Sequence, residues 1–459
     1  MDSLKKRYGL STAICMVVGI VIGSGVFFKA QDVLDETGGD AALGVLAWII
    51  GGAVMVTLAA TFAVLATKYE RVGGVVDYAE TLCGKTYGYF VGWFLSLIYF
   101  PAMTSVLAWV SARYTVVALF GVSSVSERAL FGPECIAIAA LYLVLSYFIN
   151  AVAPRLAGKI QVSATVIKLI PLFVIAIVGV AVGSFNGTLG ESLSAPVARG
   201  GGSLFAAVSC TAFAYEGWII ATAINAEIKN AKRNLPIALT VGAAVIVLAY
   251  LLFYLGVLGL ADTDTLLTEG TTAAFDTLGP FFSSVINMLV VVSCLGTLNG
   301  LMLATTRGIF ALSVRGEGVS PSTFSEVDRH TNTPHNSASL GLLLTALWLF
   351  YFLGSQFFGW FGALRFDSSE LPVLTIYPLY APILISFMIK ERGTHPALRF
   401  VLPSLSLVGC GIMVAASIFR HGSEVLAYLL VFAAIMLLGA AFLFLNRKRK
   451  KDIEISERV

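Results

Sequence analysis

The sequence predicts an all-α membrane protein that crosses the bilayer about twelve times. Of its 459 residues, 58% are hydrophobic and only 12% are charged, whereas a soluble domain carries about 25% charged residues. The apolar residues form long continuous runs rather than the short alternating segments of a membrane β-barrel. Because a chain in lipid must satisfy its backbone hydrogen bonds internally, such runs form helices.

About twelve runs are long enough to cross the roughly 30 Å of hydrocarbon in a bilayer. The segments between them hold most of the charge, and none resembles a separate soluble domain. We therefore expect one transmembrane domain over residues 1–459, ending in a tail at residues 447–459. The runs begin near Leu10, Ala42, Tyr87, Leu130, Ile160, Ser203, Ile237, Phe281, Ser339, Leu371, Val401 and Val425.

The distribution of basic residues predicts the orientation of the chain. When both termini are placed in the cytoplasm, most of the 30 Lys and Arg residues fall on the cytoplasmic side, as the positive-inside rule requires. The first apolar run lacks a small-residue cleavage site, so we interpret it as a retained first span. One loop on the other side is acidic, with Asp262, Asp264, Glu269 and Asp276.

The sequence shows no pattern that indicates a metal, a cofactor or catalysis. The six cysteines lack the close pairs of zinc sites and disulfide frameworks, and the four histidines all fall in loops. A channel would need repeated polar rings along a continuous pore. The net charge of +3 gives no reason to expect a nucleic-acid partner. An intramembrane enzyme and a channel are therefore the least favoured functions.

The first span contains an interruption at residues 19–27 (GIVIGSGVF), where three glycines and a serine lower the helix propensity of an apolar run. Unwinding there would expose the backbone amides of Gly23, Ser24 and Gly25. These amides would lie at the N-terminus of the following half-helix, which favours a carboxylate ligand. The alternative is that the glycines only allow close helix packing.

The sixth span contains a second interruption at residues 213–218 (FAYEGW). An aromatic cluster alone commonly reflects core packing. However, five spans separate the two interruptions, and an odd number reverses orientation, so the two halves would form an inverted repeat with broken helices at the midplane. Such a site suits a zwitterionic amino acid, whose carboxylate would meet Gly23 to Gly25 and whose ammonium would meet carbonyls near Ile20 and Phe213.

Lys168 lies inside the fifth span. Lys159 should lie at the cytoplasmic boundary, which places Lys168 about 13 Å deep along a helix that rises about 1.5 Å per residue. A charge near the midplane usually faces a cavity or a partner inside the bundle. The alternative is a side chain that snorkels to the interface, and the depth disfavours it.

These motifs resemble those of the amino acid, polyamine and organocation superfamily, in particular the L-type amino acid transporters and the bacterial serine/threonine exchangers. The resemblance covers most of the chain. It is carried by the segments at residues 19–27 and 213–218, Gly73-Gly74 before Tyr78, Gly92-Trp93, Lys168-Leu169-Ile170-Pro171, Glu227 and Asn230, and Ser293 before Leu298-Asn299-Gly300.

The resemblance implies a leucine-transporter-like fold of five plus five inverted helices, with two helices added at the C-terminus. The repeats would span residues 9–184 and 202–391, and the extra helices would span residues 399–446. Alternating access by rocking and gating around a central site is the implied mode of transport.

The resemblance also implies roles for individual residues. Phe213 matches the aromatic residue that closes over the substrate, and Tyr250 matches a tyrosine near it. Lys168 matches a lysine that replaces a bound sodium ion and ties the fifth helix to the first and to the eighth near Ser293. The expected substrate-binding residues are Ile20, Gly23, Ser24, Gly25, Phe213, Ala214, Tyr215, Gly217 and Tyr250. The expected coupling and gating residues are Lys168, Phe213, Ser293, Gly19 and Glu216.

The resemblance implies sodium-independent exchange of neutral L-amino acids. The physical argument agrees, because a fixed ammonium would supply the charge of a bound cation and remove the cation gradient as an energy source. A proton-coupled symporter is the alternative if Lys168 loses its proton during transport. Glu216 stands where relatives have acidic residues or glycine. It would brace the unwound segment, shape substrate choice or carry a proton, and we prefer bracing.

Two departures from the family pattern affect the expected partners and the gate. Animal L-type transporters carry a cysteine after the third span that links a glycoprotein partner, whereas this loop has serines at Ser123 and Ser124. We therefore expect no disulfide-linked subunit. The absence of this cysteine and the short tails favour the plasma membrane of a prokaryote. The tenth span carries more prolines than the family pattern, at Pro372, Pro378 and Pro382.

Overall fold

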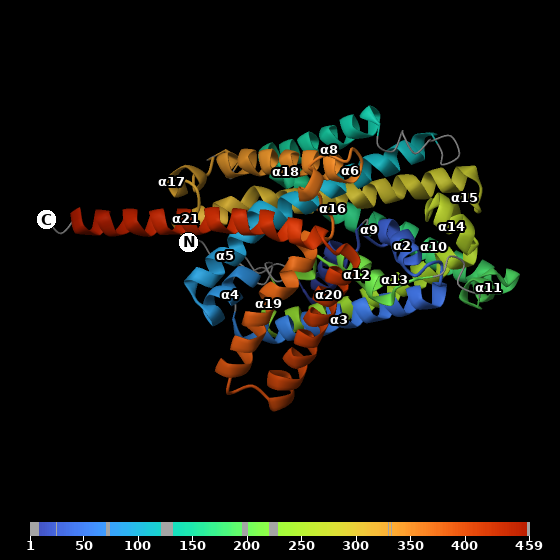
Figure 1. Ribbon diagram of the computed structural model, residues 1–459, viewed down its shortest axis with the longest axis horizontal. Coiled ribbons are helices and arrows are strands. Elements are labelled where there is room, and N and C mark those ends of the chain that lie inside the picture. Colours follow the sequence, from blue (N-terminus) through green and yellow to red (C-terminus); the bar gives the residue numbers. More distant parts are fainter. Residues whose placement is uncertain are drawn as a thin grey trace.

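The computed structural model describes residues 9–23, 25–69, 74–120, 132–194, 201–219, 228–328, 330–331 and 333–456. Within these ranges the regular structure is helical, without a β-strand. Ten of the helices found there are long and apolar enough to cross a membrane. They run largely side by side along the longest axis of the molecule (Figure 1). The predicted all-α membrane fold is therefore confirmed.

The spans long enough to cross a bilayer occur in the order that the hydropathy predicts. They are α3 (Ala41–Lys68), the continuous α5, η1 and α6 (Lys85–Phe120), α8 (Pro133–Val152), α10 (Leu169–Asn186), α13 (Ala231–Leu260), α16 (Pro280–Val314), α18 (His335–Gln356), α19 (Leu371–Lys390), η4 with α20 (Ala397–His421), and α21 (Glu424–Ser456).

The shorter helices complete the interrupted spans and connect the long ones. They are α1 (Leu10–Val21), α2 (Gly25–Glu36), α4 (Val75–Cys83), α9 (Pro154–Ile167), α11 (Thr188–Ser194), α12 (Leu204–Tyr215), α14 (Thr263–Glu269), α15 (Thr272–Asp276), α17 (Pro321–Phe324) and η3 (Gly362–Leu364). The prolines Pro378 and Pro382 lie inside α19, which remains one continuous helix.

The first and sixth spans are broken in the bundle interior. The helix α1 ends at Val21, Ile22 is extended with a ψ of 103°, and α2 begins at Gly25. In the sixth span α12 ends at Tyr215, and Glu216 is extended with a ψ of 166°. Gly217 follows with a φ of +103°, a conformation that only glycine adopts readily.

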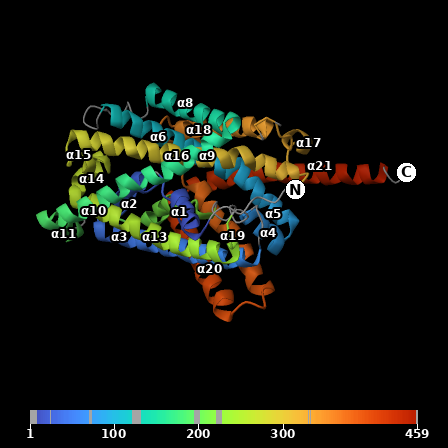
Figure 2. The ribbon, with the colours of Figure 1, turned by 180° about the vertical axis from the view of Figure 1, so that it is seen from behind.

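The helices α10 and α13 pack with their backbones in direct contact, and α13 also runs along α3 (Figure 2). A Cβ atom added at Gly256 would lie 2.3 Å from the Ile175 carbonyl oxygen, and one at Gly179 would lie 2.1 Å from the Gly256 carbonyl oxygen. Small residues at such contacts are typical of membrane helices, which gain stability from close van der Waals packing.

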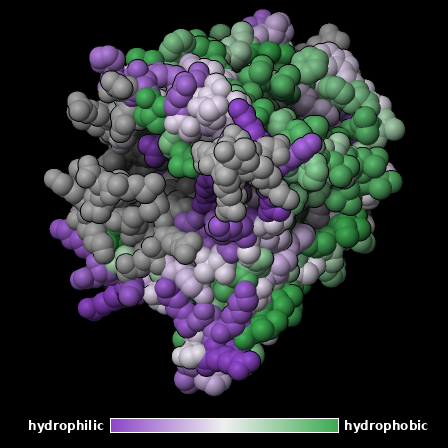
Figure 3. All heavy atoms as spheres, turned by 90° about the vertical axis from the view of Figure 1, so that its left-hand side faces the viewer, coloured by the Kyte–Doolittle hydropathy of each residue, from purple (hydrophilic) through white to green (hydrophobic). Residues whose placement is uncertain are grey.

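Charged side chains mark the two ends of the bundle. The tail face, from which α21 projects, carries the ion pairs of Lys68 with Glu391 and of Arg315 with Asp77 and Glu80. Figure 3 views the molecule from this end and shows hydrophilic side chains around a hollow. The far face, at the other ends of the helices, carries Glu36, Arg113, Glu269, Arg365 and Arg420.

We predict that Gly256→Leu destabilises the protein, because the new side chain would force α10 and α13 apart. Overpacking a filled contact costs about 1–3 kcal/mol. The measurement is thermal unfolding in detergent, where the variant should melt several degrees below the parent protein. Gly411→Leu is the matched control, because nothing lies within 4 Å of a Cβ added at that helical glycine. Equal melting temperatures for the two variants would contradict the packing argument.

Candidate functional site

A central cavity lies where the two broken spans meet the third and eighth spans. The first span contributes Val21, Gly23 and Gly25, and the sixth contributes Phe213, Glu216 and Gly217. Segments almost two hundred residues apart in the chain thus form one site. The remaining wall comes from Tyr99, Met103, Leu107, Thr297 and Leu301.

The glycines of the first break line this cavity and also permit close packing. A Cβ atom at Gly23 would lie 2.6 Å from Thr297 Oγ1, and one at Gly25 would lie 2.6 Å from the Cα of Ala214. Side chains are excluded at both positions, so the backbone itself lines the cavity. The predicted site residue Ser24 lies outside the described residues, as does the side chain of Ile20.

Lys168 lies at the junction of α9 and α10 and is 0% exposed. Its Nζ donates a hydrogen bond to the carbonyl oxygen of Gly19. This carbonyl lies in the last turn of α1, so it has lost the partner that a continuous helix would supply. The ammonium therefore satisfies a backbone group that the break in the first span sets free.

The predicted tie from Lys168 to Ser293 is absent from the hydrogen bonds of the described residues. Ser293 is fully buried in α16, and its hydroxyl has no hydrogen-bond partner there. The fifth span nevertheless packs directly on α16, since a Cβ atom at Gly296 would lie 2.5 Å from Ala164 Cβ. The fifth and eighth spans thus meet by close packing, and the buried Cys294 of α16, next to Ser293, lies near Lys168.

Tyr250 connects the two breaks from behind the cavity. Its hydroxyl lies 3.1 Å from the carbonyl oxygen of Val21 and 3.1 Å from that of Ala214. These are the ends of α1 and α12, and one hydroxyl proton can serve either carbonyl. Tyr250 and Ala214 are not part of the cavity wall, so their place is structural support of the two broken ends.

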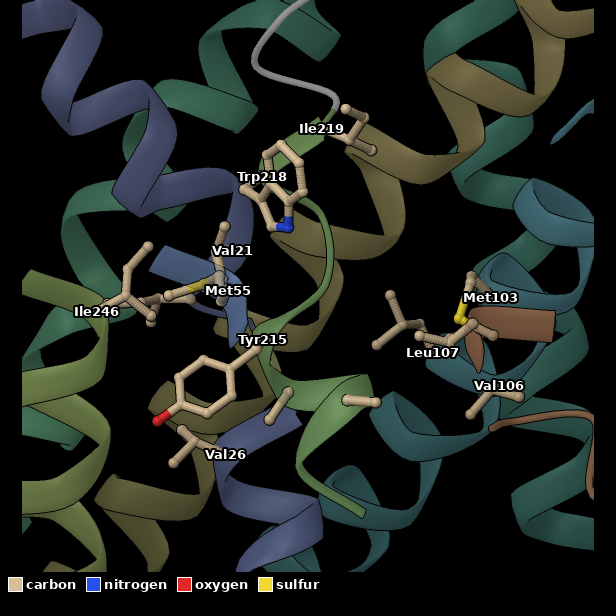
Figure 4. Close-up of a cluster of buried hydrophobic side chains, with 14 of the residues drawn as sticks. Val21, Val26, Met55, Met103, Val106, Leu107, Tyr215, Trp218, Ile219 and Ile246 are labelled. Carbon is tan, nitrogen blue, oxygen red and sulfur yellow. The ribbon is translucent and has the colours of Figure 1, made fainter. Parts of the chain in front are cut away.

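Tyr215 also points away from the cavity. Its hydroxyl donates to the carbonyl oxygen of Trp48 at 3.0 Å, and its ring packs against Trp48 and Tyr250. Figure 4 shows the Tyr215 ring on the side of Val26 and Ile246, with Met103 and Leu107 on the opposite side of the interrupted segment. Of the predicted substrate-binding residues that the structure describes, Gly23, Gly25, Phe213 and Gly217 line the cavity.

The sequence of this chain matches one family of membrane transport proteins over nearly its full length. The sequence profile of the family described as amino acid permease matches residues 8–454. The chain belongs to the amino acid permease family. It is therefore a membrane transport protein and not an enzyme.

Several characterised relatives of this permease are amino acid transporters. The serine/threonine exchanger SteT of Bacillus subtilis is 27% identical, and the alignment covers 98% of each chain. The human cystine/glutamate transporter is 24% identical over 84% of this chain and 79% of its own. The rabbit b(0,+)-type amino acid transporter 1 is 26% identical over 72% of this chain and 68% of its own.

Aromatic side chains cover the central cavity of the permease on the side of the far face. The rings of Phe213 and Phe28 lie 6.2 Å apart with an angle of 71° between their planes, and Phe28 lies 5.9 Å from Trp109. The Lys29 ammonium lies 4.7 Å from the Phe28 ring and 5.7 Å from the Phe213 ring. These cation–π contacts connect the aromatic cover to an ionic cluster above it.

Glu216 lies in the wall of the central cavity and is only 7% exposed. The Tyr99 hydroxyl and the Gly217 N–H are its polar neighbours, but neither carboxylate oxygen accepts a hydrogen bond of normal geometry. The ion pairs found among the described residues do not include Glu216 either. The carboxylate thus lies beside Tyr99 of the third span and beside the Gly217 N–H of the unwound segment, and bracing of that segment by Glu216 stays a prediction.

A buried ionic cluster, which sequence reasoning missed, holds α2 against α19 and α20. Glu370 at the start of α19 accepts from Lys29 Nζ at 2.5 Å and from Arg420, and His421 Nε2 lies 3.2 Å away. Arg420 also pairs with Glu36 at 2.9 Å. Lys29, only four residues after the break at Gly25, was the feature of the sequence that could have indicated a buried ion pair.

The tail face is held together by more exposed ion pairs. Glu391 accepts from Lys68 Nζ at 2.5 Å and from the Tyr69 hydroxyl. These hydrogen bonds lower the pKa of the Glu391 carboxyl below its usual value. Here the end of α3 is joined to the segment after α19.

We predict that Glu370→Gln destabilises the permease, because it leaves the Lys29 and Arg420 cations close together without the carboxylate between them. Removing one partner of a buried ion pair costs about 3–5 kcal/mol. Thermal unfolding in detergent would measure the effect. Glu424→Gln is the control, since Glu424 pairs at 3.8 Å with an Arg365 side chain that is 51% exposed. A Glu370→Gln protein as stable as the control variant would show that the cluster contributes little.

Proposed function

We propose that this permease exchanges neutral L-amino acids across the plasma membrane without sodium, by alternating access to the central cavity. The observation that carries the proposal is the buried Lys168 ammonium at the break in the first span. A fixed positive charge at that point leaves no need for a bound sodium ion. The description of the Bacillus relative as an exchanger supports the same mode.

The cavity wall supports an amino acid as substrate. The exposed backbone of Gly23 and Gly25 offers N–H groups at the start of α2 for a carboxylate. Val21, Met103 and Leu107 provide an apolar surface for an uncharged side chain. Phe213 lines this cavity and packs against Phe28 on its far-face side, which supports the proposal that Phe213 acts as a gate.

The inverted repeat, over residues 9–184 and 202–391, is part of the proposal. Each proposed repeat begins with a broken span, the first repeat with the first span and the second repeat with the sixth. The helices that follow these spans, α3 and α13, pack against each other. The helices α6 and α16 form the next such pair. The helices within residues 399–446 would then be additions that lie outside the repeat.

Transport requires the two sides of the cavity to open in turn. Opening toward the far face requires α2 to separate from α19 and α20, which breaks the contacts of Glu370 with Lys29 and Arg420. We propose that the far face is extracellular and that both termini are cytoplasmic, in agreement with the basic residues of the loops. The loop with Ser123 and Ser124 lies outside the described residues, and we propose that no disulfide-linked subunit attaches there.

Proton-coupled symport is the second candidate, and Glu216 favours it. A carboxylate in the cavity wall that makes no ion pair with the described residues is a group that can take up and release a proton as the cavity opens. In this case the proton gradient, and not an internal amino acid, would drive accumulation.

Uptake by proteoliposomes separates the two candidates. Vesicles that contain unlabelled neutral L-amino acid should accumulate labelled substrate, whereas empty vesicles should not. Sodium, the proton gradient and the internal amino acid are varied separately against a panel of amino acids. Equal uptake by empty vesicles under a proton gradient would replace exchange by symport, and a strict sodium requirement would exclude both.

We predict that Lys168→Ala lowers the exchange rate ten- to hundredfold, because the buried Gly19 carbonyl loses its donor, at a cost of about 1–3 kcal/mol. The rate is measured per molecule of monodisperse protein, so that folding and transport are separated. Lys448→Ala, on the projecting part of α21, is the control. Full exchange activity in Lys168→Ala would remove the lysine from the mechanism.

A further inference from the structure

A second cavity lies on the far-face side of the aromatic cover. It is walled by α2, by the last turns of α6, and by the connection between α14 and α15. Phe28 belongs to the wall of this far-face cavity, and Phe213 belongs to the wall of the central one. The two cavities are therefore separated by the Phe28 and Phe213 rings, whose centroids are 6.2 Å apart.

Arg113 contributes a half-buried guanidinium to the far-face cavity. Its nearest aromatic contact is the Trp109 ring, 5.8 Å away. Among the described cations of the far face, Lys29, Arg365 and Arg420 each pair with a carboxylate, whereas the ion pairs of the described residues do not include Arg113. A guanidinium withdrawn from water in this way offers its planar donors to an anion.

The other groups of the cavity complete a pattern that matches a zwitterion. Glu269 lies in the same wall and supplies a negative charge, and no ion pair of the described residues includes it. Phe27, Phe28 and Tyr114 supply apolar surface between these charges. An amino acid carries an α-carboxylate, an α-ammonium and a side chain. The cation, the anion and the aromatic surface of this cavity can bind these three parts in turn.

We propose that the far-face cavity is a second amino acid site, in which Arg113 binds the α-carboxylate and Glu269 faces the α-ammonium. The inference rests on the proposed function and extends it. A substrate that arrives from the far face occupies this site first, and it passes Phe28 and Phe213 when α2 moves. A guanidinium and a carboxylate form two parallel hydrogen bonds, which orients the substrate as well as attracting it.

Substitution of Arg113 should change the KM on only one side of the membrane. Arg113 lies outside the aromatic cover, so it affects capture from the far face and not capture from the tail face. Its aromatic contact is Trp109 at the edge of the cover, and the contacts of the described residues do not join it to Lys168 or to the broken ends of α1 and α12, so we expect the rate of the conformational change to stay the same. The expected signature is a change of KM on one side of the membrane with an unchanged maximal rate.

The test measures exchange from each side, in intact cells for the far face and in inverted membrane vesicles for the tail face. Arg113→Gln should raise the far-side KM at least tenfold, leave the tail-side KM unchanged and change the maximal rate less than twofold. Arg113→Lys keeps the positive charge but loses the paired donors of the planar guanidinium, so it should give an intermediate far-side KM. Glu269→Gln, at an exposed position, should raise the far-side KM about threefold without any risk to folding. Arg365→Gln is the matched control, an arginine of the same face outside the cavity.

Three outcomes would overturn the second site. The first is an unchanged far-side KM in both Arg113→Gln and Glu269→Gln. The second is an equal rise of the KM on both sides of the membrane in these variants. The third is a far-side KM that depends on chloride in the parent protein but not in Arg113→Gln. The last result would assign Arg113 to an inorganic anion. Absence of amino acid exchange in the parent protein would instead contradict the proposed function, so the two failures are distinguishable.

Discussion

The hydrogen bond between the Lys168 ammonium and the Gly19 carbonyl is the interaction on which the central cavity depends. A helix can end inside a membrane only where another group satisfies its freed carbonyls, and Lys168 performs this task for α1. Tyr250 offers its one hydroxyl proton to the carbonyl of either Val21 or Ala214, at the ends of α1 and α12. One buried cation and one buried hydroxyl thus supply donors to carbonyls at the two breaks.

Among the described residues, some charges of this permease are paired and others face a cavity. Lys29, Glu370 and Arg420 form ion pairs that hold α2 against the last helices. Glu216 and Arg113 lie in cavity walls, outside the ion pairs of the described residues. Since an unpaired charge in a membrane protein is costly, its place in a cavity wall favours a role toward a substrate or a proton.

Close packing explains why the cavity has this shape. The glycines of the first break contact α16 and the sixth span so tightly that a single Cβ atom would meet Thr297 or Ala214. The same residues therefore expose the backbone to the cavity and set the distance between the spans. Site formation and helix packing, which the sequence presented as alternatives for these glycines, are two effects of one geometry.

The sequence by itself determined the features that depend on local composition. Long apolar runs, the low helix propensity of residues 19–27 and the place of Lys168 inside a span were sufficient to predict the all-α fold, its broken spans and a buried lysine. Tertiary structure alone decided which side chains face the cavity. Tyr215 points to Trp48, Ser293 makes no hydrogen bond with Lys168, and Lys29 joins a buried ionic cluster. The rotation of each helix and its contacts with distant segments fix these directions, and hydropathy contains no information about them.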